Sequence, residues 1–557
     1  MKKILPFIIA VIITLSGSAQ QDNLFEISKN LELFFSVVKE LQINYADQID
    51  PGKLTSTAIK SMLNTLDPYT ILIPEDQIQN YRFFMSGEYG GIGITSLQRA
   101  NGDCTIIDVK EDSPASRAGL KPGDLIVEIN NIDLKDKTDE DIDILIKGEV
   151  GSPISLSIMK YKSNQIEKLT LLRENIQLPN ISYSGMIGDD IGCIRLEQFT
   201  DKSSKEFYEA FQKLRQSKNL KGLIIDLRGN GGGLLDQAVT IVNQFVDKGL
   251  LIVSTRGRNI DRNRNYYTTN PPLDLSIPLV VLVDKYTASA SEILAGALQD
   301  LDRAVVIGEK TFGKGLVQNI LPLPYNNQLK ITIAKYYIPS GRCIQAIDYF
   351  KHDQNRTSVQ TKPVFYTHNG RMVFEQGGIE PDLPSDSVSN NPLINSLFQN
   401  FIIFDFVNEF AYQHPHIDPL EKFTLDNKIF NDFIQFTTDR YKDWDYENIN
   451  LLQQLRNQLS AQNRLDNEIK SSLDKIELQL YDQIPILLSQ TREDLSFPLM
   501  SEIISRYTKP QDRIKFLITN DPEITKAANL LRDMTTYQSI LAGTHPNCHN
   551  RLRPANP

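Results

Sequence analysis

Hydrophobic and polar positions follow distinct patterns along the 557-residue chain, and each pattern predicts a different type of element. Apolar residues recur at helical spacing over residues 24–43, and residues 54–66 predict a second helix that ends at Asp67-Pro68. From residue 87 to about residue 170 the chain changes to short β-rich runs broken by glycine and proline. The N-terminal part is therefore predicted to hold helices followed by a small β-rich domain.

Apolar β-branched runs then alternate with helical patterns from about residue 171 to residue 382. The runs GLIIDL, IPLVVLVD and AVVIG are separated by the helical patterns LLDQAVTIVNQFV and ASEILAGALQD. This alternation predicts an α/β domain with a largely parallel sheet. Beyond residue 385 the chain is polar, rich in Asn, Gln and Asp, and helical in pattern, which predicts an accessory or docking domain.

Composition narrows the class of protein. The chain is 41% hydrophobic and 23% charged, as is ordinary for globular proteins, and its length predicts three or four domains. A net charge of -10 without a lysine and arginine stripe argues against nucleic-acid binding.

The first residues have the layout of a secretory signal peptide. Lys2 and Lys3 precede an apolar run over residues 4–15, and the small residues Gly17-Ser18-Ala19 follow. We expect residues 1–19 to direct export to the periplasm or cell envelope of a bacterium, with an uncleaved membrane anchor as the alternative.

Neither a disulfide framework nor a metal site is predicted. The four cysteines are Cys104, Cys193, Cys343 and Cys548, and their wide separation favours buried free thiols. Close to the C-terminus, His545, Cys548 and His549 lie near one another, and we interpret this cluster as incidental. We therefore expect no cofactor.

The run GEYGGIGITSL and the segment DVKEDSPASRAGLKPGDLIVEIN together resemble a PDZ domain. Glycines allow successive backbone N–H groups to turn inward and form an anion-binding nest. Ser113-Pro114-Ala115 predicts a short helix, and Gly123-Asp124 predicts the turn into the next strand. The resemblance implies that the loop Gly91, Ile92, Gly93 and Ile94 receives the C-terminal carboxylate of a peptide that adds as an extra strand.

The segment KYTASASEILAGALQD predicts a strand, a tight polar turn and a helix, with Ser289 at the turn. A hydroxyl at a helix N-terminus is well placed to attack a carbonyl, because the N–H of Ala290 would face the developing oxyanion. Thr287 and Ser291 are the competing nucleophiles.

A second glycine-rich turn, DLRGNGGG, follows a predicted strand. Its Gly231 or Gly232 could bring another N–H to the same oxyanion. Consecutive glycines without the GxGxxG register argue against a dinucleotide site.

The base that would activate Ser289 is predicted to be Lys314. All six histidines lie at residue 352 or later, in no recognisable catalytic setting, whereas Lys314 follows the strand AVVIG in GEKTFGKG. That motif lacks the Ser or Thr of a phosphate-binding P-loop, since Gly315 takes its place. A lysine acts as a base only when neutral, and shifting a lysine pKa to about 7 costs about 4.6 kcal/mol, which desolvation can supply. Gln318 could orient the amine without adding charge.

These segments together resemble the C-terminal processing peptidases, or tail-specific proteases. Matching stretches cover roughly residues 40 to 385 and include DLRGNGGG, TASASEILAGALQD, GEKTFGKGLVQ, KITIAKYYIPSGRCIQ and GGIEPD. The resemblance implies a multidomain α/β fold with crotonase-like ββα units, an inserted PDZ domain and a Ser-Lys dyad. By position, the family's nucleophile, base and orienting glutamine fall on Ser289, Lys314 and Gln318. The family commonly has proline after the asparagine of DLRGN, where this chain has Gly231.

The predicted organisation follows from these segments. It comprises a signal peptide at 1–19, N-terminal helices at 20–85, a PDZ domain at 86–170, a serine protease core at 171–388 and a helical region at 389–557. We expect an exported serine endopeptidase that binds the free C-termini of its protein substrates. A non-catalytic PDZ scaffold and a non-peptide hydrolase such as an esterase are the alternatives. An adaptor or self-association through the helical region, and peripheral membrane association, stay open.

Overall fold

The structure is a computed structural model that describes residues 5–78, 87–349, 363–375, 377–385, 391–417, 423–440 and 447–546. Residues 5–23, 76 and 447–449 are described by their backbone alone. The chain divides into two compact units. Unit 1 holds Met1–Glu75 with Gln318–Thr332, and unit 2 holds Asp76–Val317 with Ile333–Pro557.

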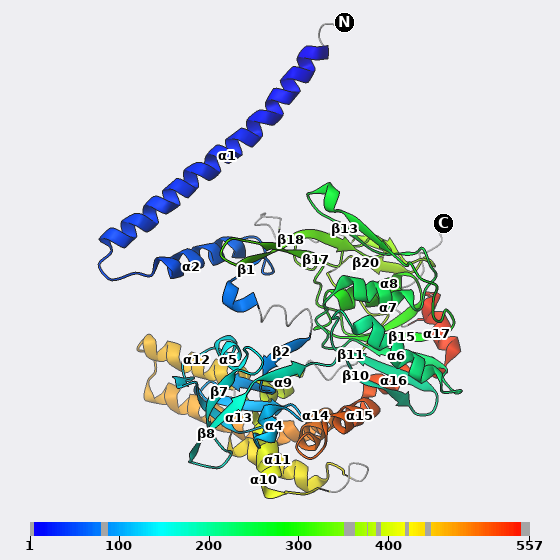
Figure 1. The fold of residues 1–557 in the computed structure, drawn as a ribbon. Helices are drawn as coiled ribbons and strands as arrows, with labels where there is room; N and C mark the ends of the chain where they lie inside the picture. Colours follow the sequence, from blue (N-terminus) through cyan, green and yellow to red (C-terminus); the bar gives the residue numbers. More distant parts are fainter. Residues whose placement is uncertain are drawn as a thin grey trace. The chain divides into compact units, whose positions relative to one another are not determined.

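Unit 1 begins with a 40-residue helix, α1 (Leu5–Asn44), which includes the helix predicted at residues 24–43 (Figure 1). The second predicted helix is confirmed as α2 (Pro51–Asn64), which starts at the N-cap Asp50, whose side chain accepts the Lys53 N–H. Strand β1 (Ile71–Ile73) then pairs antiparallel with the first half of β18. None of the helices in the described ranges combines the length and apolar character that crossing a membrane requires.

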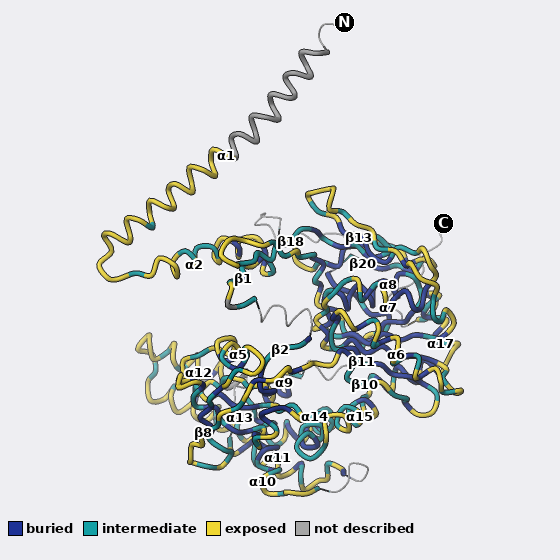
Figure 2. Tube along the Cα trace, in the orientation of Figure 1, coloured by how far each residue is buried: buried dark blue, intermediate teal, exposed yellow. Residues whose placement is uncertain are grey.

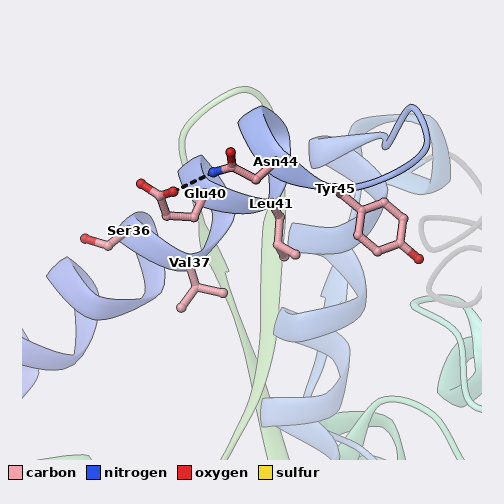
Figure 3. A pocket seen from close by; sticks show the side chains of 6 residues that line it. All are labelled: Ser36, Val37, Glu40, Leu41, Asn44 and Tyr45. Carbon is pink, nitrogen blue, oxygen red and sulfur yellow. Dashed lines mark hydrogen bonds between the residues drawn. The ribbon is translucent and has the colours of Figure 1, made fainter.

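The last turns of α1, together with Tyr45 just beyond its end, line a shallow hollow within unit 1 (Figure 3). Apolar side chains of Val37, Leu41 and Tyr45 line it, and Asn44 donates to the Glu40 carboxylate at 2.7 Å. The hollow contains no predicted site residue.

The predicted PDZ domain of unit 2 is a curved antiparallel sheet closed by two helices. Its elements are β2 (Glu88–Gly91), β3 (Ile94–Gln98), β4 (Cys104–Val109), α4 (Pro114–Arg117), β5 (Leu125–Ile129), β6 (Ile132–Asp133), α5 (Asp139–Ile146), β7 (Pro153–Met159), β8 (Ile166–Leu172) and β9 (Glu174–Gln177). The sheet order is β3-β4-β5-β7-β8, with β6 on β5, and β2 pairs with β9. Ser113 caps α4 as predicted, because its side chain accepts the Ser116 N–H. Strand β3 lies at the edge of the sheet.

The α/β core of unit 2 is built on a second, mostly parallel sheet. Its elements, with the strands that continue into unit 1, are β10 (Ile181–Ile187), β11 (Ile191–Leu196), α6 (Ser203–Arg215), β12 (Gly222–Asp226), α7 (Leu235–Asn243), β13 (Leu251–Arg256), β14 (Arg264–Tyr267), β15 (Leu279–Val283), α8 (Ala290–Asp300), β16 (Ala304–Gly308), β17 (Leu316–Pro322), β18 (Gln328–Tyr337), β19 (Val364–Tyr366), β20 (Met372–Phe374) and β21 (Leu383–Pro384). The strand order is β10-β11-β12-β15-β16-β21, and β11, β12, β15, β16 and β21 run parallel. The predicted parallel α/β domain is confirmed.

Alternate residues of the core strands face two different helical layers, so both faces of the sheet are buried (Figure 2). In β12, Leu223 and Ile225 pack with α6, α7 and α8, whereas Ile224 packs with α16 and α17. Because both faces are covered, the strands read as continuous apolar runs in the sequence.

The C-terminal region is helical, as predicted. Its elements are α9 (Pro392–Gln399), α10 (Ile402–Gln413), α11 (Asn427–Asp439), α12 (Glu447–Ala461), α13 (Asn467–Gln490), α14 (Arg492–Ile504), α15 (Pro510–Asn520), α16 (Pro522–Arg532) and α17 (Met534–Leu541). Helices α9, α10, α11, α13 and α14 share a core of their own. Helices α16 and α17 instead cover one face of the parallel sheet, and a Cβ at Gly222 would lie 3.1 Å from Leu531. The last helices thus complete the α/β core.

Candidate active site

Three loops that follow parallel strands meet at one edge of the core sheet. The loop after β12 carries Gly231, the loop after β15 carries Ser289, and the loop after β16 carries Lys314. Because β12, β15 and β16 are parallel neighbours, their carboxyl ends lie at the same edge. The topology therefore gathers the residues that the sequence singled out.

Ser289 lies in a strained turn immediately before α8. Its backbone has φ 59° and ψ -117°, outside the regions that residues other than glycine usually adopt, at a cost of about 1–3 kcal/mol. This sharp strand-to-helix turn leaves the Ser289 side chain half-buried rather than enclosed. Within the described ranges no hydrogen bond uses the Ala290 N–H at the start of the helix. A nucleophile and an oxyanion donor can therefore stand side by side here.

The two competing hydroxyls are both buried and hydrogen-bonded. Thr287 donates to the Leu227 carbonyl at 2.9 Å, and Ser291 donates to the Asn230 carbonyl at 3.0 Å. Both hydroxyls hold the turn against the loop after β12. This geometry favours Ser289 as the nucleophile.

A buried carboxylate, Glu292, joins the Ser289 turn to the Lys314 loop. Its Oε2 accepts the backbone N–H groups of Ser289 and Lys314, each at 2.8 Å. Its Oε1 accepts the Gly313 N–H at 2.8 Å and the Thr311 hydroxyl at 2.6 Å. Burial raises the pKa of Glu292 above its usual value, and the four hydrogen bonds oppose that rise. The segments that carry the predicted dyad are thus fixed to one side chain.

Further contacts define the surroundings of Lys314, whose side chain is half-buried. Its carbonyl accepts the Tyr336 hydroxyl, and the neighbouring Phe312 N–H donates to the Thr287 carbonyl at 3.0 Å. Of the apolar neighbours of Lys314 in the sequence, Leu316 is buried, whereas Phe312 is 54% exposed.

The loop after β12 packs directly against the nucleophile turn. Asn230 accepts the Ala288 N–H at 3.0 Å through its carbonyl, and its side chain accepts the Gly232 N–H at 2.9 Å. A Cβ at Gly232 would lie 2.9 Å from the Ala290 nitrogen, so only glycine fits at this φ of 99°. Within the described ranges no hydrogen bond uses the Gly231 N–H. The structure thus brings all three predicted oxyanion residues together. Among the described residues, the N–H groups of Gly231 and Ala290 have no hydrogen-bond acceptor.

Gln318 belongs to unit 1, whereas Ser289 and Lys314 belong to unit 2. Within unit 1 its side-chain amide donates to the Thr332 hydroxyl at 3.4 Å, and Thr332 in turn donates to Asp67 at 3.1 Å. The orienting role of Gln318 toward Lys314 stays a prediction.

The predicted carboxylate loop of the PDZ domain is tightly folded. The Ile92 carbonyl accepts the Ala115 N–H at 3.0 Å, and the Gly93 carbonyl accepts the Lys110 N–H at 2.8 Å. Gly93 has a φ of 77°, and Ile92 is fully buried. The loop, which runs from Gly91 to Ile94, leads directly into edge strand β3.

Across the described ranges no group of three potential ligands has the spacing of a metal site. Cys548 and His549 of the cluster noted in the sequence lie outside the described residues. The other three cysteines, Cys104, Cys193 and Cys343, are buried free thiols, as predicted.

Sequence reasoning missed the bridging role of Glu292. A serine followed by glutamate three residues later is the signature of a capping box, which accounts for the contact with the Ser289 N–H. The contact with the Lys314 loop joins positions 22 residues apart, and no local pattern announces it.

Three family models match the chain. Residues 190–355 match peptidase family S41, residues 105–159 match a PDZ domain, and residues 393–531 match the "probable PDZ-protease, C-terminal helical domain". The third match covers the helices α9 to α16, so the helical region also accompanies PDZ proteases elsewhere.

Curated relatives are carboxy-terminal processing proteases. The protein of that name from Bartonella bacilliformis is 36% identical over 345 residues, covering 61% of this chain and 78% of the relative. Carboxy-terminal processing protease CtpA of Bacillus subtilis is 33% identical over 307 residues, covering 55% of this chain and 65% of the relative. Among solved structures, the photosystem II D1 C-terminal processing protease is 26% identical, with a TM-score of 0.37, covering 64% of this chain and 92% of that one.

Proposed function

This chain belongs to the carboxy-terminal processing proteases of peptidase family S41, which are serine proteases, and we propose that it cleaves proteins through a dyad of Ser289 and Lys314. The observation that carries the proposal is the shared carboxylate: Ser289 and Lys314 each donate a backbone N–H to Glu292 Oε2 at 2.8 Å. One buried oxygen therefore sets the separation of the two backbones.

The chemistry follows from the two side chains. The neutral Lys314 amine takes the proton of the Ser289 hydroxyl as its Oγ attacks the scissile carbonyl carbon. The oxyanion that forms is held by the Ala290 N–H together with that of Gly231 or Gly232. Lys314 then gives its proton to the leaving amine, and a water molecule hydrolyses the resulting ester on Ser289. Gln318 orients the amine.

Substrate selection is assigned to the PDZ domain. A protein C-terminus places its carboxylate at the loop from Gly91 to Ile94 and pairs its backbone with edge strand β3. Support comes from the PDZ family match and from the edge position of β3. The signal-like residues 1–19 support substrates that are exported proteins of the bacterial envelope.

The test compares the purified full chain with Ser289→Ala and Lys314→Ala on an unstructured protein that ends in an apolar tail. Both variants should lose cleavage by at least about a thousandfold, because each removes one half of the dyad. Lys285→Ala is the matched control, since Lys285 is an exposed lysine in the loop before Ser289. Cleavage that survives either dyad substitution would refute the mechanism.

The same assay separates the alternatives. Amidation of the substrate's C-terminus should raise KM and leave kcat unchanged, because only capture of the carboxylate is lost. Tail binding without any cleavage by the wild type would support a scaffold. Hydrolysis of simple esters without proteolysis would support an esterase.

A further inference from the structure

A buried cluster of charges lies at the carboxyl end of β12, directly before the oxyanion loop. Asp226 is fully buried and accepts Nε and Nη2 of Arg228 at 2.9 and 2.8 Å. Arg195 on the neighbouring strand reaches the same carboxylate at 3.1 Å. One edge of the Arg228 guanidinium, formed by Nε and Nη2, is therefore directed at its own strand end.

The remaining nitrogen of Arg228 is held by the C-terminal helical region. Nη1 lies 2.8 Å from Asp521 Oδ2 and 2.7 Å from Glu523 Oε2, at the N-terminus of α16. These side chains are only 14%, 17% and 19% exposed, so solvent screens the contact weakly. Asp521 uses its other oxygen to cap α16, accepting the Glu523 N–H at 2.7 Å. The helix end and the acidic pair therefore form one rigid anchor.

Arg228 is separated from the predicted oxyanion donor by only two residues. Its own N–H donates to Asp226 at 3.1 Å, and the next N–H, that of Gly229, donates to Asp284 at 3.0 Å. The Arg228 side chain and the backbone that leads to Gly231 are thus tied to the same carboxylate, that of Asp226.

We propose that Asp521 and Glu523 are positioning residues for proteolysis: by gripping Arg228, they hold the loop that supplies the oxyanion N–H at its working distance from Ser289. This proposal rests on the proposed function, because the loop has a catalytic role only if the chain cleaves substrates through Ser289. It gives the end of the helical region an indirect part in catalysis, through the position of this loop. An error of about 1 Å in such a loop can reduce turnover by about a hundredfold.

The test is the double variant D521N/E523Q in the full chain. Asparagine keeps the helix cap while it removes the charge that faces Arg228. We expect kcat for a short peptide substrate to fall about tenfold or more, while KM stays within about twofold. The loss should be smaller than the roughly hundredfold to thousandfold cost of deleting an oxyanion donor. Labelling of Ser289 by a fluorophosphonate should slow in parallel, whereas the variant D521N/E523D, which keeps one negative charge beside Arg228, should retain most of kcat.

Arg532→Gln is the matched control. It breaks an ion pair of 2.8 Å with Asp190 at the other end of α16, which also fixes this helix to the core but lies away from the oxyanion loop. We expect a smaller loss of thermal stability, because Arg532 is 39% exposed, and an unchanged kcat. An unchanged kcat in the double variant, or an equal loss in the control, would overturn the proposal. Activity that does not depend on Ser289 would instead refute the proposed function itself.

Discussion

The catalytic loops and the PDZ domain of unit 2 are held by contacts of different kinds. Glu292 is fully buried and fixes the Ser289 and Lys314 backbones with hydrogen bonds of 2.8 Å. The PDZ domain is attached to α10 by side chains that solvent reaches. In the pair of Lys162 with Glu409 these are 44% and 20% exposed, and in the bidentate pair of Arg99 with Asp405 they are 21% and 18% exposed.

The difference indicates where regulation can act. Buried hydrogen bonds to a carboxylate are costly to break, because the donors left behind have no water to replace them. Of these pairs, the more exposed one, Lys162 with Glu409, contributes about 1 kcal/mol or less. Under the proposed function, binding of a substrate tail would therefore disturb the contact with α10 more easily than the hydrogen bonds that hold the Ser289 and Lys314 backbones.

Glu292→Gln should have the largest effect on the catalytic side of this comparison. The amide can accept on one oxygen only, so its NH2 group would face backbone donors. We expect a loss of about 2–5 kcal/mol in unfolding free energy and at least about a hundredfold in kcat. Urea unfolding and peptide kinetics measure the two effects.

Glu206→Gln is the control for that substitution. Glu206 is also a glutamate in the first turn of a core helix, where it accepts from Asn180 at 3.0 Å at a half-buried position. The control should stay near wild type in both measurements. Equal behaviour of the two variants would show that Glu292 has no special bridging role.

Gly232→Ala should come next in size. Its Cβ would lie 2.6 Å from the Ala288 carbonyl oxygen and 2.8 Å from the Ser289 Cβ, at a φ of 99°. The nucleophile turn must therefore shift, and kcat should fall by about a hundredfold. Gly231→Ala is the matched control, because a Cβ there meets open space, and it should keep its activity. A fully active Gly232→Ala would contradict the observed packing.

The same loop allows the oxyanion donor to be assigned. Gly231→Pro removes one backbone N–H of the loop. If Gly231 is the donor, kcat falls by roughly a hundredfold to a thousandfold, whereas Gly231→Ala stays active. Retained activity of the proline variant would assign the role to Gly232, after its N–H leaves Asn230.

Gly93→Ala should affect the PDZ side alone. A Cβ at Gly93 would lie 2.3 Å from the Ser113 Cβ at a φ of 77°. We expect KM for a tailed substrate to rise about tenfold, with hydrolysis of a short tail-free peptide unchanged. Gly119→Ala controls for backbone strain, since Gly119 has a φ of 75° and open space around it. Equal effects of both variants would mean that strain, rather than the carboxylate loop, is responsible.

Sequence patterns predicted local features well and distant contacts poorly. The buried strands β12, β15 and β16 could be recognised because both of their faces are apolar, and Ser113 followed by Pro114 announced α4. The packing of α16 onto the sheet could not be read, since an amphipathic helix does not specify which apolar surface it covers. The ion pair of Asp521 with Arg228 joins residues 293 positions apart, so no local sequence pattern could predict it.

Acidification should produce the smallest effect. It should weaken the contact between the PDZ domain and α10. Burial alone would raise the pKa of Glu409 on α10, but hydrogen bonds from Lys162, Gln413 and Tyr161 outweigh it and lower this pKa below the usual 4.5. The stabilisation is therefore present above pH 4.5 and is lost as the pH falls through the lowered value. Hydrogen exchange of α10, corrected for intrinsic rates, should rise on acidification while exchange of α8 does not. In Glu409→Gln this rise should be absent, because the amide does not titrate; an identical rise would show that another carboxylate, such as Asp405, controls the contact.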